Sequence, residues 1–145
     1  MEIKFTVPGE PRGKQRPRVV SRNGFSKAYT PKETLVYENL IKWYYQQAAG
    51  NYQFPDDAMI DVRIIAYFVI PKSASKKKKQ QMLDHEIRPT KKPDLDNICK
   101  LVCDALNALA YHDDASVVDC QVRKFYSDSP RLEIKISQIG GKEPK

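Results

Sequence analysis

Four acidic residues and a lysine fall within a short stretch in the second half of the chain. Asp94 and Asp96 are followed by Lys100, and Asp113 and Asp114 come after one helix length. Carboxylates are hard oxygen ligands suited to Mg²⁺, and a bound divalent cation relieves the repulsion between them. The chain of 145 residues is nevertheless basic, with a formal net charge of +7. Acidic residues gathered in a cationic protein indicate a metal site that acts on a polyanion.

The length and composition are those of a single globular domain. Hydrophobic residues make up 41% of the chain and charged residues 30%, which is ordinary for a protein that buries a core. We expect one domain over residues 1–139 and a disordered tail over residues 140–145. No apolar run is long enough to cross a bilayer, and residues 1–5 lack the apolar block of a secretory signal.

The surplus of basic residues favours an anionic partner. Nucleic acid is preferred to an anionic membrane, because no segment combines a strongly basic face with a large apolar face. Cys99, Cys103 and Cys120 are too few and too scattered for a disulfide framework, which favours a reducing, cytoplasmic setting. Cys99 and Cys103 are four residues apart, as metal ligands can be. Without a second pair at zinc spacing, we interpret them as packing residues at the edge of the core.

Hydrophobic periodicity predicts an α+β fold. Strands are expected over residues 3–7, 60–70, 118–122 and 132–136, and helices over residues 30–50, 76–83 and 94–110. The basic segment that begins at Arg12 contains Pro and Gly and is expected to be a loop. The order of the elements favours a small mixed or antiparallel sheet of about four strands packed with two main helices.

The first long helix has a clear start and one apolar stripe. Thr30 is suited to cap it, Pro31 fits the first helical position, and Glu33 can complete a capping box. The apolar residues that recur at helical spacing are Val36, Leu40, Trp43 and Tyr44.

The strand over residues 60–70 is apolar at every even position, which predicts that one face packs on the core along its length. The odd positions change from polar to apolar at Ile65, Tyr67 and Val69. Something must cover this second apolar surface, either another part of the chain or a second subunit.

The helix that begins near Asp94 has two opposite faces. At 100° per residue, one side carries Leu95, Ile98, Val102, Leu106 and Leu109, and the other carries Asp96, Asn97, Lys100, Asp104 and Asn107. Lys100 is four residues from both Asp96 and Asp104, so it can lie between two acids.

Each acid also has an ordinary structural interpretation. Asp94 can be an N-cap, Asp96 a first-turn acid favoured by the helix dipole, and Asp113 with Asp114 a polar turn. His112, beside this pair, is either a ligand or proton relay or a turn residue without a role. Whether the loop that follows the helix returns to the start of the helix decides between a metal site and separate structural acids.

Two basic segments are candidates for contact with phosphates. Lys14, Arg16 and Arg18 lie in the expected loop, and Lys76, Lys77, Lys78 and Lys79 form an uninterrupted run. Such residues suit backbone contacts without base recognition. The lysine run is equally consistent with a solvated, mobile face.

The motif residues resemble those of the RusA family of Holliday-junction resolvases. The resemblance is carried by Lys92-Pro93-Asp94-Leu95-Asp96-Asn97-Ile98-Cys99-Lys100, by Asp104-Ala105-Leu106-Asn107 and by Tyr111-His112-Asp113-Asp114-Ala115-Ser116-Val117-Val118. The segment Gly13-Lys14-Gln15-Arg16-Pro17-Arg18 is similar to the basic N-terminal segment of the family, and the last two strands match its ending. The D-L-D-N-x-x-K motif and the D-D pair are specific as a set, although each alone is weak.

The resemblance implies a homodimeric, Mg²⁺-dependent endodeoxyribonuclease, with Mn²⁺ as a possible substitute, that nicks four-way DNA junctions in pairs during recombination and repair. The lysine run resembles phage and prophage forms of the family, for which another branched DNA can be the substrate. The residues implied are Asp94, Asp96 and Asp114 as metal ligands and catalytic acids, Lys100 as the catalytic lysine, and Asn97 and Asp113 in support. As a point cation, Lys100 suits neutralising phosphate oxygens better than orienting water.

A protein that binds branched DNA without cutting it is the alternative. The basic segments would serve that protein equally well, but unscreened carboxylates would repel its ligand. A third possibility, a general nuclease, would cut linear duplex as readily as branched DNA.

Overall fold

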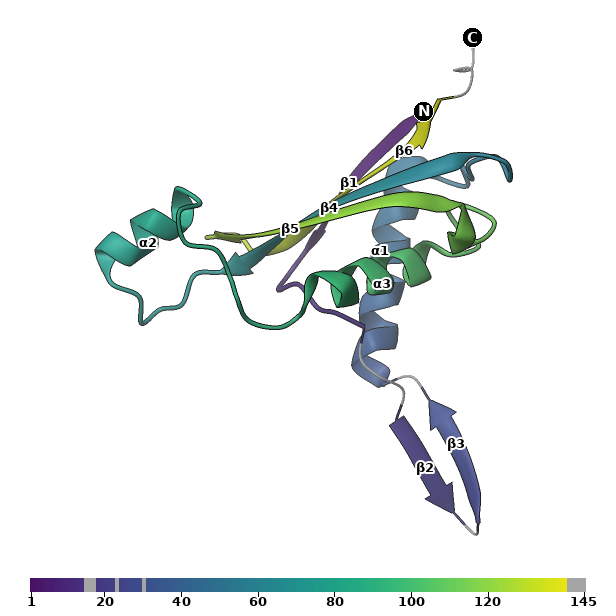
Figure 1. Cartoon of the computed structure of the whole chain (residues 1–145), viewed down its shortest axis with the longest axis horizontal. Helices are drawn as coiled ribbons and strands as arrows, with labels where there is room; N and C mark the ends of the chain where they lie inside the picture. The colour runs from purple at the N-terminus through teal and green to yellow at the C-terminus, as the bar shows by residue number, and fades with distance from the viewer. Residues whose placement is uncertain (15–17, 23, 30, 141–145) are drawn as a thin grey trace.

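The structure is a computed structural model that describes residues 1–14, 18–22, 24–29 and 31–140. It confirms the α+β fold, with one four-stranded mixed sheet and a separate two-stranded ribbon (Figure 1). The strands are β1 (Glu2–Pro8), β2 (Arg18–Arg22), β3 (Phe25–Tyr29), β4 (Met59–Val69), β5 (Val117–Ser127) and β6 (Arg131–Ile139). The helices are α1 (Lys32–Ala49), α2 (Lys76–Leu83) and α3 (Leu95–Leu106), with a 3₁₀ turn, η1 (Asp114–Ser116).

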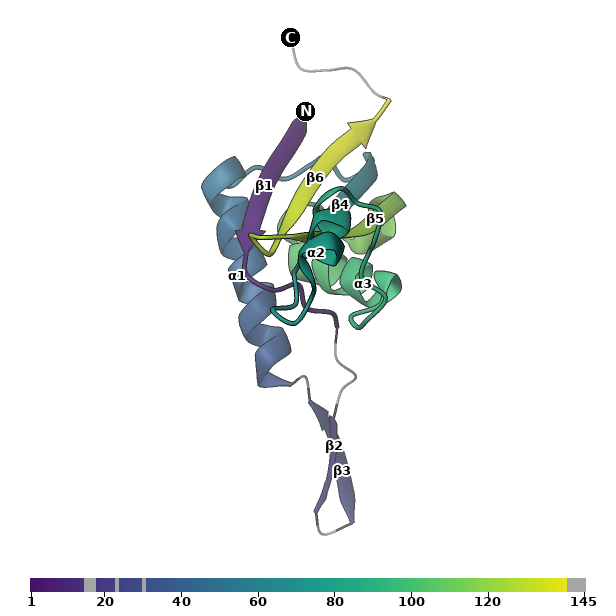
Figure 2. The ribbon, with the colours of Figure 1, turned by 90° about the vertical axis from the view of Figure 1, so that its left-hand side faces the viewer.

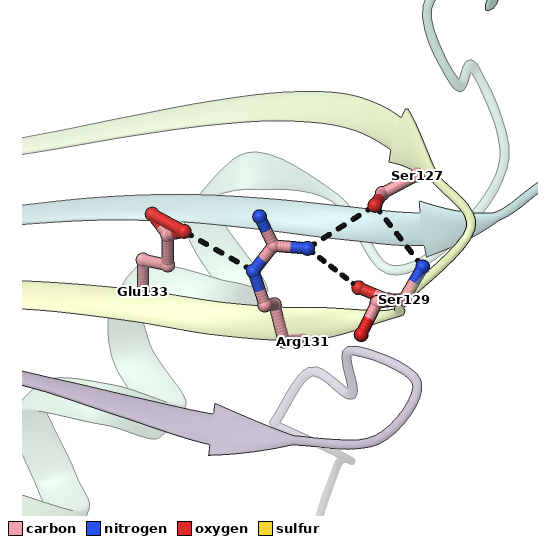
Figure 3. Close-up of polar contacts among 4 residues, drawn as sticks. All are labelled: Ser127, Ser129, Arg131 and Glu133. Atoms are coloured by element: carbon pink, nitrogen blue, oxygen red, sulfur yellow. Dashed lines mark hydrogen bonds and ion pairs between the residues drawn. The ribbon is translucent and has the colours of Figure 1, made fainter. Parts of the chain in front are cut away.

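The main sheet has the order β1-β6-β4-β5. β4 pairs parallel with β5 and antiparallel with β6, and β6 also pairs antiparallel with β1. β5 and β6 are therefore not neighbours, although only a short turn joins them. Figure 3 shows how Arg131 closes this turn: its guanidinium donates to Ser127 Oγ (3.1 Å), to the Ser129 carbonyl (2.7 Å) and to the Glu133 carboxylate (3.1 Å).

The core lies between one face of this sheet and the two long helices. The expected alternation in β4 is confirmed, because its even positions from Ile60 to Phe68 are all buried. α1 and α3 both pack on this face (Figures 1 and 2). The opposite face of the sheet is largely open, and there Ile65 and Tyr67 are half-buried and Val69 is exposed.

Only part of the apolar stripe predicted for α1 packs on the core: Leu40 and Tyr44 are half-buried against it, but the other two residues are not. Val36 and Trp43 are 59% and 52% exposed, and the fully buried positions of α1 are Tyr37, Ile41 and Tyr45. The sequence contains two overlapping apolar stripes, and periodicity alone does not tell which one faces inward. Pro31 is the N-cap residue, with no side-chain capping bond, rather than the first helical residue. Thr30, the expected cap, lies outside the described residues.

Two other boundaries differ from those expected. α3 ends at Leu106 rather than near residue 110, because Asn107 is its C-cap and Ala108 adopts a positive φ of 64°. Part of the expected basic loop is the ribbon of β2 and β3, which projects away from the sheet and helices in both views (Figures 1 and 2). Arg16 and residues 141–145 of the expected tail lie outside the described residues.

The short helix α2 matches its predicted bounds, and Ser75 caps its start. Ser75 Oγ accepts a hydrogen bond from the Lys78 backbone N–H at 3.3 Å. α2 stands beyond the end of the sheet, away from α3 (Figure 1). Within the described part of the chain, no helix combines the length and apolar character needed to span a membrane.

Candidate active site

Asp94 and Asp96 lie at the start of α3 with exposed side chains. Asp94 occupies the N-cap position, yet its carboxylate makes no capping hydrogen bond. Elsewhere the chain does use its caps, since Ser75 and Asp113 each accept a backbone N–H bond at a helix start. The cap interpretation of Asp94 therefore leaves its carboxylate without a partner, and both acids are available to a cation from solvent.

The polar face of α3 continues through Lys100 to Asp104. Asp104 forms an ion pair with Lys14, whose Nζ lies 3.5 Å from Asp104 Oδ2 and 2.6 Å from Glu38 Oε1 on α1. Burial alone would lower the pKa of Lys14, but the hydrogen bond and charge of Glu38, together with Asp104, raise it. Lys14 is thus a half-buried cation that joins two helices. A phosphate contact, as expected from the sequence, would require it to leave both carboxylates.

The chain returns to α3 through the loop that contains Asp113 and Asp114. The Asp114 backbone N–H donates to Asn107 Oδ1 at 3.0 Å, and the Asp113 carboxylate accepts from the Ala115 N–H at 3.3 Å. Asn107 thereby fixes Asp114 at the end of α3. This role was not predicted, although Asn107 lies on the polar face that the sequence identified.

Asp114 lies in a negatively charged environment. A hydrogen bond with Asp113 raises the pKa of Asp114 most, and partial burial and the charges of Asp113 and Asp104 act in the same direction. Lys100 is close enough to oppose this effect. The structure therefore brings Asp104, Asp114 and Lys100 together, and a cation placed among these acids would relieve their repulsion.

The three acids expected to share a metal are not gathered in the same way. Among the described residues, no three carboxylates converge as potential ligands of one ion, and the one group of three ligand atoms that does converge is made of thiols. Asp94, Asp96 and Asp114 are distributed along one helix face and the loop at its end. Hard carboxylate donors with free side chains fit a hard divalent cation. Asp94 and Asp96 lie at one end of α3 and Asp114 at the other, so sharing one ion would require the loop that carries Asp114 to move as well.

A cleft of about 560 Å³ runs beside the start of α3. Its walls are residues 11–14, the first turn of α1, residues 92–94 and Asn97. Gly13 makes this packing possible, because a Cβ there would lie 2.7 Å from Pro93 Cβ and 3.0 Å from Asn97 Cβ. The Lys14 N–H also donates to the Asn97 carbonyl at 3.0 Å.

Three basic residues near Asp94 were not predicted. Arg12 and Lys92 line the cleft. Lys124 on β5 has a pKa that burial lowers, although the charge of nearby Asp94 acts in the opposite direction. Cys120, Val122 and Tyr126 are the inward-facing residues of β5. Lys124 occupies the same alternate positions, and this pattern in the sequence could have placed it on the inner face of the sheet.

The remaining predicted residues lie apart from these acids. Lys76, Lys77 and Lys78 are exposed on α2, and Lys79 is half-buried there. Arg18 is the first residue of β2.

Comparison with known proteins gives two findings. The family model described as Endodeoxyribonuclease RusA matches residues 8–137. The chain is also 41% identical over 139 residues to "Uncharacterized protein YqaN" of Bacillus subtilis (strain 168), an alignment that covers 94% of this chain and 96% of that protein. The family match includes both acidic motifs and the whole of β4 and β5.

The environment of Asp114 predicts how a neutral residue at this position changes stability. Because the pKa of Asp114 is higher in the folded chain than in the unfolded chain, its ionised carboxylate destabilises the fold at pH values above that pKa. This destabilisation disappears as the pH falls through the pKa. Asp114→Asn should therefore melt about 1–4 °C above the wild type at neutral pH, the scale for one surface charge. The difference should shrink in acid, and Mg²⁺ should stabilise only the wild type.

Calorimetry of the metal-free proteins checks this prediction. Asp128→Asn is the matched control, because it removes the same charge from an exposed position in the turn between β5 and β6. A variant at Asp114 that melts below the wild type at neutral pH would show that repulsion does not dominate around this carboxylate.

Proposed function

The chain belongs to the RusA family of endodeoxyribonucleases, and from that premise we propose that it is a Mg²⁺-dependent enzyme that resolves four-way DNA junctions by paired nicks. The observation that carries the proposal is the pair of exposed carboxylates, Asp94 and Asp96, at the start of α3. Neither has a structural partner among the described residues. In a chain of net charge +7, such acids are best explained as ligands.

The proposed roles follow from the donor chemistry of each residue. Asp94, Asp96 and Asp114 would hold the ion. The Asn107 side chain would position Asp114 by accepting a hydrogen bond from the Asp114 backbone N–H. Bound Mg²⁺ supplies an activated water and stabilises charge on the scissile phosphate. Lys100, on the same helix face, would neutralise phosphate oxygens as a point cation.

The DNA backbone has a basic path to these acids. Arg12 and Lys92 line the cleft that ends at Asp94, and Lys124 lies near the same carboxylate. These residues would position the strand without reading its sequence. Lys14 would act indirectly, because its ion pairs with Glu38 and Asp104 hold the cleft wall against α3.

Removing the anionic ligands should separate cleavage from binding. Asp94→Asn and Asp96→Asn preserve shape, so cleavage of a synthetic four-way junction should fall by roughly 100-fold or more, as when an enzyme loses one charge-stabilising group. Junction affinity should persist or increase, since the variants repel phosphate less. Mn²⁺ should support cutting by the wild type, and Ca²⁺ should support binding without efficient cutting.

Single-turnover cleavage with Asp128→Asn as the control makes this test specific to the site. Full Mg²⁺-dependent activity in both motif variants would exclude the proposed ligands. Tight junction binding by a wild type that never cuts would favour the non-catalytic alternative, and equal cutting of linear duplex would favour a general nuclease.

The α2 lysines and Lys100 should have opposite effects. Replacing Lys76, Lys77, Lys78 and Lys79 with Gln retains good helix formers. This variant should bind junctions more weakly. The slope of log affinity against log salt concentration should become shallower by roughly one unit for each lysine that neutralises a phosphate in the wild type. It should still cut normally at saturation. Lys100→Ala should bind almost normally and turn over slowly.

Affinity measured across a salt series, together with single-turnover rates, checks both variants. An unchanged salt slope in the α2 variant would identify its lysines as a solvated surface only. Normal cutting by bound Lys100→Ala would remove that lysine from the catalytic site.

We also propose that a second copy of the chain covers the open face of the sheet. Paired nicks in a two-fold junction call for two sites related by a two-fold axis. The open face carries Ile65, Tyr67 and Val69, and the Arg131 guanidinium stacks over the Tyr67 ring at 4.0 Å. The same face carries the acidic Glu133 and four basic residues, Lys4, Arg63, Arg123 and Lys135, so apolar burial rather than charge would drive the contact.

Light scattering at micromolar concentration should report a dimer for the wild type and a monomer for Ile65→Glu. Val36→Glu is the control, because Val36 is an exposed apolar residue of α1 on a different surface. Dissociation by Val36→Glu alone would place the interface on α1, and a monomeric wild type that still makes paired nicks would contradict the dimer itself.

A further inference from the structure

All three cysteines of the chain meet at one place outside the acidic face. Cys99 and Cys103 lie one turn apart on α3, and Cys120 approaches them from β5. The three thiol sulfurs all lie within 4.8 Å of one another, and the Cys99 and Cys103 sulfurs are 4.0 Å apart. Cys103 is buried, while Cys99 and Cys120 are half-buried.

This arrangement changes the interpretation of the cysteines as packing residues. Cys99 and Cys103 do lie at the edge of the core, as expected, but Cys120 completes a trio that sequence spacing did not predict. Around a tetrahedral Zn²⁺ with bonds of about 2.3 Å, sulfur atoms are about 3.8 Å apart. The observed separations of no more than 4.8 Å are close enough to this value for small side-chain rotations to reach it.

The chemistry of the trio differs from that of the acids. Thiolates are soft ligands that select Zn²⁺ over Mg²⁺. Hydrogen bonds from Cys103 and then Cys120 lower the pKa of the Cys99 thiol, which favours the anionic form that binds metal. Hydrogen bonds with Cys103 and Cys99, together with burial, raise the pKa of Cys120, so the ion must itself displace that proton. Because two of the three thiols are half-buried, an ion can reach them from solvent, and water can complete its coordination.

We propose that Cys99, Cys103 and Cys120 bind one Zn²⁺ ion at a site separate from the carboxylates of α3. Each thiol that coordinates the ion releases its proton to solvent. The ion would tie α3 to β5 and so support the helix that carries Asp96 and Lys100. The proposal concerns binding and stability only, and it stands whether or not the chain cuts DNA.

Titration of the reduced, metal-free protein with Co²⁺ and then Zn²⁺, without DNA, tests the site. One equivalent of Co²⁺ should give a thiolate-to-cobalt charge-transfer band, which Zn²⁺ then displaces, and Zn²⁺ should raise the melting temperature. Cys120→Ser should weaken binding by at least about 100-fold, since loss of a residue that only orients a ligand already costs up to that much. Asp128→Asn, changed at an exposed position outside both sites, should give the same charge-transfer band and the same displacement by Zn²⁺ as the wild type.

A second measurement uses the wild type alone, so that a poorly folded variant does not decide the outcome. Zn²⁺ should slow the reaction of all three thiols with a thiol-reactive dye. The proposal is overturned if the charge-transfer band is missing, if Cys120→Ser retains it at full affinity, or if Zn²⁺ leaves the dye reaction unchanged. Mass spectrometry that finds a disulfide in protein purified under reducing conditions would also overturn it.

Discussion

The ammonium group of Lys14 lies between two carboxylates from different helices, and the arrangement of the candidate site depends on it. Glu38 is 8% exposed on the core side of α1, and Asp104 lies on the polar face of α3. Lys14 and Asp104 are half-buried, so removing Lys14 would leave the buried Glu38 carboxylate with an uncompensated charge, which costs more than the net gain from the intact pair. Gly13, the preceding residue, lets the chain approach Pro93 and Asn97 closely enough for Lys14 to reach both acids. This packing fixes one cleft wall and, with it, the approach to Asp94.

α3 presents three kinds of surface around one cylinder. Its apolar residues, such as Leu101 and Val102, are fully buried against the sheet. One flank carries oxygen ligands and a lysine, and the other carries two thiols that meet a third from β5. We propose that the two polar flanks bind different ions, because hard carboxylates and soft thiolates differ in metal preference. The ion bound by the thiols would then hold α3 against β5, and the ion bound by the carboxylates would take part in the reaction.

Sequence patterns predicted the structural features that depend only on residues close together in the chain. The alternation from Ile60 to Phe68 and the two faces of α3 both follow from the period of each element. Patterns could not choose between Val36 and Tyr37 as the inward stripe of α1, because this depends on the burial of Glu38 by Lys14, 24 residues away. The convergence of Cys120 with Cys99 and Cys103 likewise depends on β5 pairing parallel with β4 beneath α3. The acidic motif was found from its residue types, whereas Arg12 and Lys124 were missed because tertiary packing brings them to it. Lys92 lies in the motif itself, two residues before Asp94.

The central claim is that the start of α3 and the loop at its end share one divalent cation. Paramagnetic broadening of backbone amide signals by Mn²⁺, with the protein free of DNA and its thiols occupied by Zn²⁺, locates that ion directly. The account predicts that the amides of Asp94, Asp96, Asn97, Asp113 and Asp114 broaden first, that excess Mg²⁺ restores them, and that Asp96→Asn weakens the effect. Broadening centred on α2, or spread without preference over the chain and unchanged in Asp96→Asn, would contradict it.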